Sequence, residues 1–226
     1  MTETGSDSVV VLFKGGRLPS WDALTDQQRE EYQQIHVDLM LQVGARHGMI
    51  GLEGFRLVTP QQNWQRFWTI EFPTFAGARA WIENEMAPPY GRYGFYEYFL
   101  ATRWRREQLD AWVTNPLPPV SVPADADPRV VPSLSVSGDS VVVLSFVRRP
   151  PDLDGAVTVT GGDEEQEARM KSVARDFGLM RCEAFELIAP QRDWNLVMVA
   201  EFPGLAGAEA WIDAAVQPPH GQEETS

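Results

Sequence analysis

Length, composition and charge set the first limits on this chain. It has 226 residues, 43% of them hydrophobic, with 8 Trp and 11 Phe, which is ample for a core. Its net charge of −13 disfavours nucleic acid and anionic membranes as partners, because both would repel it. One cysteine excludes an internal disulfide. With no signal-peptide pattern and no membrane-length apolar run, we expect a cytoplasmic protein.

The first half of the chain alternates strand and helix signals. Thr25 and Gln28 resemble a capping box that opens a long amphipathic helix. Aromatic and β-branched runs indicate the strands, and the Pro-Gln-Gln-Asn turn joins two of them as a hairpin. The predicted elements are a strand over 9–13, a helix over 26–47, strands over 53–59 and 64–72, a helix over 75–86 and a strand over 95–104.

The second half of the chain repeats the first. EGFRLVTPQQNWQRFWTIEFPTFAGARAWI at 53–82 is matched by EAFELIAPQRDWNLVMVAEFPGLAGAEAWI at 183–212, and residues 48–91 share 19 of 44 positions with 178–221. The chain is therefore a duplication. Its second copy predicts a strand over 140–146, a helix over 163–177, strands over 181–189 and 194–202, and a helix over 205–216.

The duplication divides the chain into three parts. We expect a first repeat over 8–113, a linker over 114–138 that contains six prolines, and a second repeat over 139–221. The second repeat has no counterpart of the last strand of the first. Its sheet should therefore have three strands or borrow a fourth, and its open edge favours a homodimer.

The order strand, helix, strand, strand, helix, strand predicts an α+β fold of ferredoxin-like βαββαβ type. Two such repeats would pack their sheets face to face as an intramolecular barrel. With its EFP-x-x-x-G-A-x-A-W-I stretch at 71–82 and 201–212, the chain resembles the dimeric α+β barrel superfamily in tandem form. That superfamily includes cofactor-independent polyketide oxygenases, polyketide cyclases, muconolactone-type isomerases, haem-degrading enzymes and haem-binding chlorite dismutase relatives.

The resemblance to the oxygenase branch implies a pocket between sheet and helices, and differences between the copies place it in the first repeat. Several polar and aromatic residues of that repeat face smaller or apolar residues in the second. His36 could act as a general base near neutral pH, and the phenol of Tyr98 could donate a proton or hydrogen bond. The residues expected to bind substrate are Tyr32, Arg66, Trp68 and Tyr96. A packing role for the aromatic residues stays open.

Three functions are compatible with these residues. The first is an enzyme of secondary metabolism, a cofactor-independent oxygenase or cyclase that binds a polycyclic aromatic, polyketide-like substrate and needs no bound cofactor. The second is a non-catalytic ligand-binding or assembly protein that uses the same barrel. The third is a haem-binding α+β barrel protein, for which His220 is a conceivable iron ligand. No metal-ligand spacing is present in the sequence.

Overall fold

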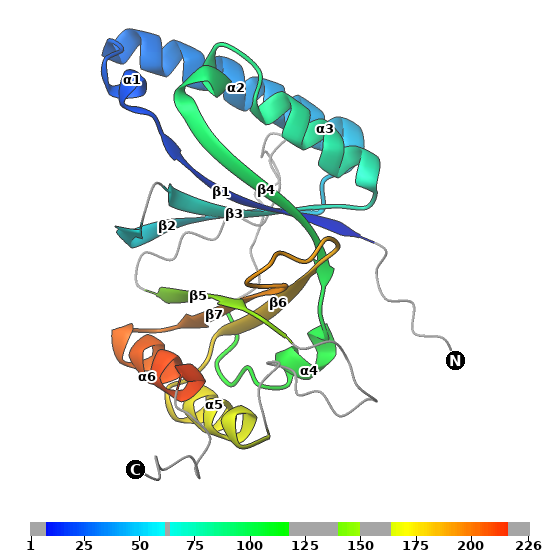
Figure 1. Ribbon diagram of the computed structural model, residues 1–226, viewed down its shortest axis with the longest axis vertical. Helices are drawn as coiled ribbons and strands as arrows, with labels where there is room; N and C mark the ends of the chain where they lie inside the picture. The colour runs from blue at the N-terminus through cyan, green and yellow to red at the C-terminus, as the bar shows by residue number, and fades with distance from the viewer. Residues whose placement is uncertain (1–7, 62–63, 118–139, 150–163, 217–226) are drawn as a thin grey trace. The chain divides into compact units, whose positions relative to one another are not determined.

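The computed structural model describes residues 8–61, 64–117, 140–149 and 164–216, which form two compact units. Unit 1 contains the described residues up to Thr102, and unit 2 contains those from Arg103 onward (Figure 1). The expected repeat boundaries stay a prediction, since compactness does not test where the duplicated sequence ends. Most of the expected linker lies outside the described residues, as does His220. The two units are described separately.

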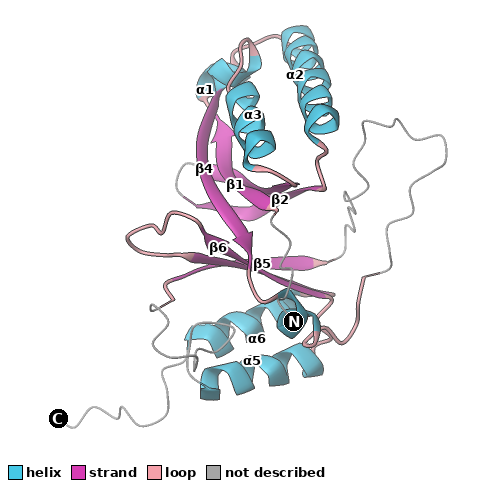
Figure 2. Cartoon of the chain, turned by 90° about the vertical axis from the view of Figure 1, so that its right-hand side faces the viewer, coloured by secondary structure: helices cyan, strands magenta, loops and turns pink. Residues whose placement is uncertain are grey.

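Unit 1 is a four-stranded antiparallel sheet with two long helices on one face. The strand order is β2-β3-β1-β4, and α2 and α3 lie side by side against the sheet (Figures 1 and 2). The elements are β1 (Val9–Arg17), α1 (Pro19–Asp22), α2 (Asp26–His47), β2 (Gly51–Gln61), β3 (Trp64–Phe72), α3 (Phe75–Glu85), the 3-10 turn η1 (Tyr90–Tyr93) and β4 (Gly94–Arg103). The expected ferredoxin-like α+β fold is confirmed.

Unit 2 repeats this arrangement with one strand fewer. Its strand order is β6-β7-β5, and α5 and α6 lie side by side. The elements are α4 (Arg106–Asp110), β5 (Val141–Val147), α5 (Glu164–Asp176), β6 (Arg181–Leu187), β7 (Leu196–Phe202) and α6 (Leu205–Val216). Among the described residues of this unit, β5 pairs only with β7, so the last strand is absent as expected. The face-to-face packing of the two sheets concerns the placement of the units and stays a prediction.

Residues that follow β4 in the chain pack against the β6 edge of the unit 2 sheet, which is the edge opposite β5. The backbone N–H of Trp104 donates to the carbonyl of Ala184 at 2.8 Å, and Leu109 and Trp112 are buried in the core of this unit. The segment that begins at Arg103 thus covers the β6 edge. It does not replace the missing strand, whose place would be beside β5.

The repeated EFP-x-x-x-G-A-x-A-W-I stretch is explained by packing. The carboxylate of Glu71 accepts a hydrogen bond from the Ser8 hydroxyl at 2.7 Å, and the Phe72 ring packs 6.0 Å from the ring of Trp81. A Cβ at Gly77 would lie 2.7 Å from Cδ1 of Phe72, so the helix can approach the strand only with glycine there. The second copy has the same contacts, through Ser140, Glu201, Phe202, Gly207 and Trp211.

Helix α2, which carries one wall of the site, has defined ends. The hydroxyl of Thr25 accepts from the backbone N–H of Gln28 at 3.2 Å, and the Gln28 side chain accepts from the N–H of Thr25 at 3.0 Å. This is the expected capping box. Gly48 ends the helix with φ of 64°, a left-handed conformation that glycine adopts at little cost. In the described part of the chain, no helix has the length and apolar character needed to span a bilayer.

Candidate functional site

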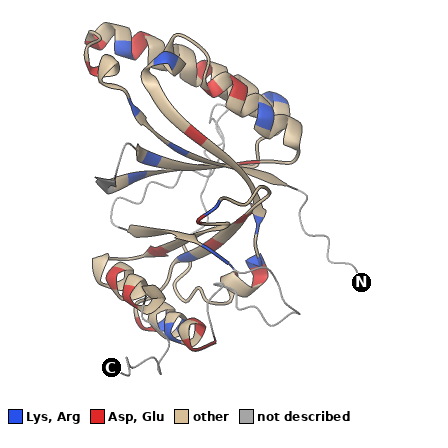
Figure 3. Ribbon diagram, viewed as in Figure 1, with Lys and Arg blue, Asp and Glu red and all other residues tan. Residues whose placement is uncertain are grey.

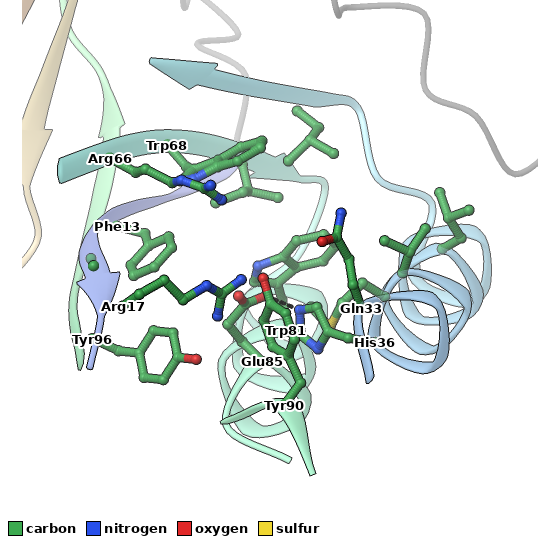
Figure 4. Close-up of a pocket in the computed structure, with 17 residues that line it drawn as sticks. Phe13, Arg17, Gln33, His36, Arg66, Trp68, Trp81, Glu85, Tyr90 and Tyr96 are labelled. Carbon is green, nitrogen blue, oxygen red and sulfur yellow. Dashed lines mark ion pairs between the residues drawn. The ribbon is translucent and has the colours of Figure 1, made fainter. Parts of the chain in front are cut away.

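Unit 1 contains a cavity of about 230 Å³ between its sheet and its helices α2 and α3 (Figure 4). Its mouth is marked by exposed lining residues, Gln33 and Val37 on α2 and Arg66 on β3. Apolar and aromatic side chains form most of the wall, and a few polar groups converge on the interior. The principal lining residues are Phe13, Arg17, His36, Met40, Leu52, Trp68, Ile70, Trp81, Glu85, Tyr90 and Tyr96.

A buried histidine and a buried glutamate join the two helices at the cavity wall. Nε2 of His36 lies 3.3 Å from Oε2 of Glu85, and both residues are 8% exposed. The imidazole stacks on the ring of Tyr90 at 3.9 Å between centroids and 11° between planes. Nδ1 of His36 is buried and has no hydrogen-bond partner in the structure. The histidine is thus held in place with one ring nitrogen still available.

Arg17 on β1 packs against aromatic rings, one of which is the Tyr90 ring that also stacks on His36. Its guanidinium lies 3.9 Å from the ring centroid of Tyr90 and 4.4 Å from that of Trp21. Burial lowers the pKa of Arg17, although an arginine remains protonated near neutral pH. Among the described residues it forms no ion pair. Arg17 and Arg66 against Glu85 give the lining a net charge of 2 − 1 = +1 when His36 is neutral.

Two tyrosines of β4 present buried hydroxyls on the helix-facing side of the sheet. Neither the Tyr96 nor the Tyr98 hydroxyl has a partner with hydrogen-bond geometry. Burial raises the pKa of both phenols. Arg17 lies close enough to Tyr96 to oppose that rise in pKa electrostatically, without forming a hydrogen bond of good geometry. Both phenols therefore remain protonated at neutral pH and can donate hydrogen bonds.

Glycines make room for the aromatic wall of the cavity. The Trp68 ring lies over Gly54, its register partner on β2, where a Cβ would be 2.5 Å from Cζ3 of the indole. The Phe13 ring lies over Gly15 in the same way, with a corresponding distance of 2.3 Å to Cζ. A side chain at either glycine would push the ring that lies over it. These glycines therefore set the shape of the cavity.

The structure brings together four of the six residues expected at the site. His36, Arg66, Trp68 and Tyr96 line the cavity. Tyr98 does not line it and instead stacks on Phe13 at 5.2 Å, and Tyr32 stacks on Tyr93 at 6.0 Å. The roles assigned to all six stay predictions.

Sequence reasoning missed Arg17, Glu85 and Tyr90 as site residues. One available signal was the difference between the copies, because Glu85 aligns with Ala215 just as His36 aligns with Gln166.

Unit 2 fills the corresponding region with apolar side chains. Leu196 and Met198 stand where unit 1 has Arg66 and Trp68, and both are buried in the core. Its paired helices are joined differently, because the Gln166 amide donates to the carbonyl of Ala215. The described residues of unit 2 contain no histidine. Among the described residues, the His36–Glu85 pair and the polar lining thus belong to unit 1.

In chemical terms the cavity offers one nitrogen ligand, cations and phenol donors. The described segments hold no cluster of three or more His, Cys, Asp or Glu residues that could bind a bare metal ion. A metal ion that is already coordinated by an organic macrocycle needs fewer protein ligands, because the macrocycle supplies the others. Fold and site together define a tandem ferredoxin-like α+β protein with a histidine-containing cavity in its first unit.

The comparisons with known proteins agree with this class. No family model matches the sequence, and no curated protein matches it. Among solved structures, the chain is similar to chlorite dismutase from Candidatus Nitrospira defluvii in complex with imidazole, with a TM-score of 0.62, 12% identity, and coverage of 95% of this chain and 84% of that one. A mutant of the same enzyme gives a TM-score of 0.63 at 12% identity, with the same coverage. The likeness shows the fold.

These neighbours correct the expected function. The solved structures reported above are chlorite dismutases, which are not polyketide oxygenases or cyclases. The expectation of a cofactor-independent oxygenase or cyclase of secondary metabolism is therefore wrong, and so is the expectation of a small aromatic ligand as its partner. Of the alternatives, the haem-binding α+β barrel protein is the one that the comparisons favour. The expected homodimer stays a prediction.

Proposed function

We propose that this protein binds haem in the cavity of unit 1, with His36 as the iron ligand. The observation that carries the proposal is the His36–Glu85 pair, in which one ring nitrogen contacts a carboxylate and the other is buried without a partner. Histidines that ligate metals commonly donate their other ring N–H to a carboxylate, which fixes the ring and raises its basicity. The superfamily that the sequence resembles includes haem-binding chlorite dismutase relatives, and the chain is similar in fold to a chlorite dismutase.

The rest of the lining suits a flat, largely apolar cofactor. Leu52, Ile70 and Met40 supply aliphatic contacts, and Phe13 and Trp68 supply ring faces. The enclosed volume of about 230 Å³ is below the roughly 300–1,000 Å³ of ordinary ligand sites. A haem would consequently extend into the mouth beside Gln33 and Val37, whose exposure leaves that side open.

In this arrangement each group of residues around His36 has a defined role. Glu85 holds the imidazole in one orientation and tautomer, and Tyr90 covers one imidazole face. The surrounding apolar side chains exclude water from the region of His36. When bound, haem would supply redox chemistry, with a potential that depends on its axial ligand and on the hydrogen bond to that ligand.

The decisive experiment is reconstitution with haemin. Purified protein titrated with haemin should develop a Soret band with a one-to-one end point, and His36→Ala should lose that band. His47→Ala is the matched control, because His47 lies on the same helix outside the cavity lining and should leave the titration unchanged. A His36→Ala spectrum identical to that of the unmodified protein would show that the iron ligand lies elsewhere.

Replacing Glu85 tests the pair itself. Glu85→Gln keeps the shape of the side chain and removes its charge, so haemin should still bind with about 10–100-fold lower affinity. The reduction potential should rise as well, because the imidazole loses anionic character. Unchanged affinity and potential would mean that Glu85 only joins the helices.

A further inference from the structure

We propose that Arg17, Arg56 and Arg66 form an oxyanion-binding site on the helix-facing side of the unit 1 sheet, at the mouth of the cavity. The groups it takes are carboxylates or phosphates, which match the planar fork of guanidinium donors. The site does not depend on an iron ligand, so it stands apart from the proposed function. Its occupant is either the acidic side chains of a bound tetrapyrrole or a separate small anion.

The three arginines come from three neighbouring strands and share one face. Arg56 on β2 and Arg66 on β3 are direct register partners, and Arg66 is the partner of Gly15 on β1. Arg17 follows two residues later on β1, which keeps it on the same face as Gly15. Arg17 and Arg66 line the cavity, and Figure 4 shows both side chains beside it. Basic segments gather at this end of β1, β2 and β3 (Figure 3).

The positive charges of these three arginines are not neutralised by ion pairs within the described residues. Among the residues described, none of the three arginines forms an ion pair, and the nearby Glu85 carboxylate already contacts His36. Like charges directly opposite each other on neighbouring strands destabilise a sheet. Burial has the largest effect on the pKa of Arg17 and lowers it; Tyr96 and Glu85 raise this pKa, and Arg66 lowers it by repulsion. A bound anion would remove this repulsion between the arginines, although the net charge of the whole chain is −13.

In the second copy, the arginine that corresponds to Arg17 has a purely structural role. Arg149 is the counterpart of Arg17, and it forms an ion pair with Glu186 while packing 4.1 Å from the ring of Trp104. Glu186 is the counterpart of Arg56, and Leu196 that of Arg66. The same fold thus neutralises this arginine in unit 2. In unit 1 the arginine has a second cation, Arg66, beside it, and Arg56 pairs in register with Arg66. A packing role does not require these further cations.

A neutral donor completes the inner part of the site. The Tyr96 hydroxyl lines the cavity near Arg17, is buried, and has no partner that meets hydrogen-bond geometry, so its O–H proton is not donated to a protein group. Unpaired buried donors are costly, and a ligand oxygen would satisfy this one. An oxyanion between Arg17 and Tyr96 would receive charged and neutral hydrogen bonds together.

Binding of inorganic phosphate tests the site without haem. Tryptophan fluorescence should report the titration, because Trp21 contacts Arg17 and Trp68 stands two residues from Arg66. Arg56→Gln combined with Arg66→Gln should weaken phosphate binding about tenfold or more, since hydrogen bonds to charged groups contribute strongly. Arg79→Gln is the control for loss of charge. Arg79 is exposed on α3 and pairs with Glu83, so this change should leave binding unaltered.

A second pair of probes identifies the source of the anion. Protoporphyrin IX and its dimethyl ester differ only in their acidic groups. If the arginines hold tetrapyrrole carboxylates, the acid should bind at least tenfold more tightly than the ester, and the double variant should abolish that preference. If they hold a separate anion, acid and ester should bind alike while phosphate binding still needs the arginines.

Either result supports the site, whereas equal binding of every probe by the double variant and the unmodified protein would overturn it. Arg56→Glu gives an independent measure, because it introduces the charge found in unit 2 at that position. It should raise the denaturation midpoint of the empty protein and reduce phosphate binding. A lower midpoint would contradict the repulsion argued here. Loss of the Soret band in His36→Ala with phosphate binding intact would separate this site from the proposed iron ligand.

Discussion

Gly54→Ala tests whether the Trp68 ring defines the cavity floor. The new Cβ would lie 2.5 Å from Cζ3 of the indole, whereas carbon atoms in contact are about 3.5–4.0 Å apart. The ring must therefore move by about 1.0–1.5 Å, obtained by subtracting 2.5 from these limits. The open space beside the ring is the cavity, so the displaced indole should narrow it.

The free-energy change combines two opposing effects. Replacing a strand glycine by alanine stabilises by about 0.5–1 kcal/mol, because the unfolded chain loses conformational freedom. Overpacking against a ring costs about 1–3 kcal/mol. In the unmodified protein the two effects together should therefore lower the free energy of unfolding of Gly54→Ala by about 0–2.5 kcal/mol. In a Trp68→Ala background the clash is absent, and the same change should stabilise by about 0.5–1 kcal/mol.

Urea unfolding of the four proteins, followed by far-UV circular dichroism, measures this double-mutant cycle. The coupling free energy between the two sites should equal the overpacking cost, about 1–3 kcal/mol. Gly54→Ala should also weaken haemin and phosphate binding, because the ring enters the space that either ligand uses. An effect of the same sign and size in both backgrounds would refute the reasoning, since it would mean that the indole does not rest on this glycine.

Two further predictions concern titratable groups. Burial raises the pKa of Tyr98, so above a pH of about 10 this phenol ionises in the unfolded chain and stays protonated in the folded one. Each further pH unit should therefore lower the free energy of unfolding by about 1.4 kcal/mol through this residue. Urea unfolding between neutral and alkaline pH should show a shallower decline for Tyr98→Phe, and parallel curves would count against it. Cys182 is 2% exposed, and burial raises its pKa to about 12. A thiol reagent at mildly alkaline pH should therefore modify it only as unit 2 opens; rapid labelling of the native protein would contradict that.

The sequence predicted the main elements because periodicity and turn residues are local signals. The long helix from Asp26 to His47 matches the predicted bounds, because the capping box that begins it and the glycine that follows it are local signals in the sequence. The first strand was predicted to end at Phe13, yet β1 runs to Arg17. Glycine is depleted in strands, so Gly15 and Gly16 give no strand signal in the sequence. In the structure that glycine accommodates the ring of Phe13, and the strand continues.

The site was predictable only where the two copies differ. His36, Arg66 and Trp68 were selected because the second repeat replaces them, and all three line the cavity. Arg17 escaped notice because its counterpart is also arginine, and only three-dimensional structure shows that their partners differ. Glu85 also differs from its counterpart, Ala215, but it was missed because its contact with His36 joins two helices and leaves no periodic signal in the sequence.

In each unit a polar contact joins the two paired helices, and the two contacts place different constraints on sequence evolution. In unit 2 the Gln166 amide bonds to a main-chain carbonyl, an atom that any residue at position 215 would supply. In unit 1 the junction needs two particular side chains, His36 and Glu85. Among homologous sequences, positions 36 and 85 should therefore change together or not at all, while position 215 drifts. A substitution at position 85 alone would leave the buried imidazole at position 36 without its partner. Each lineage that loses one of these two side chains should therefore soon lose the other.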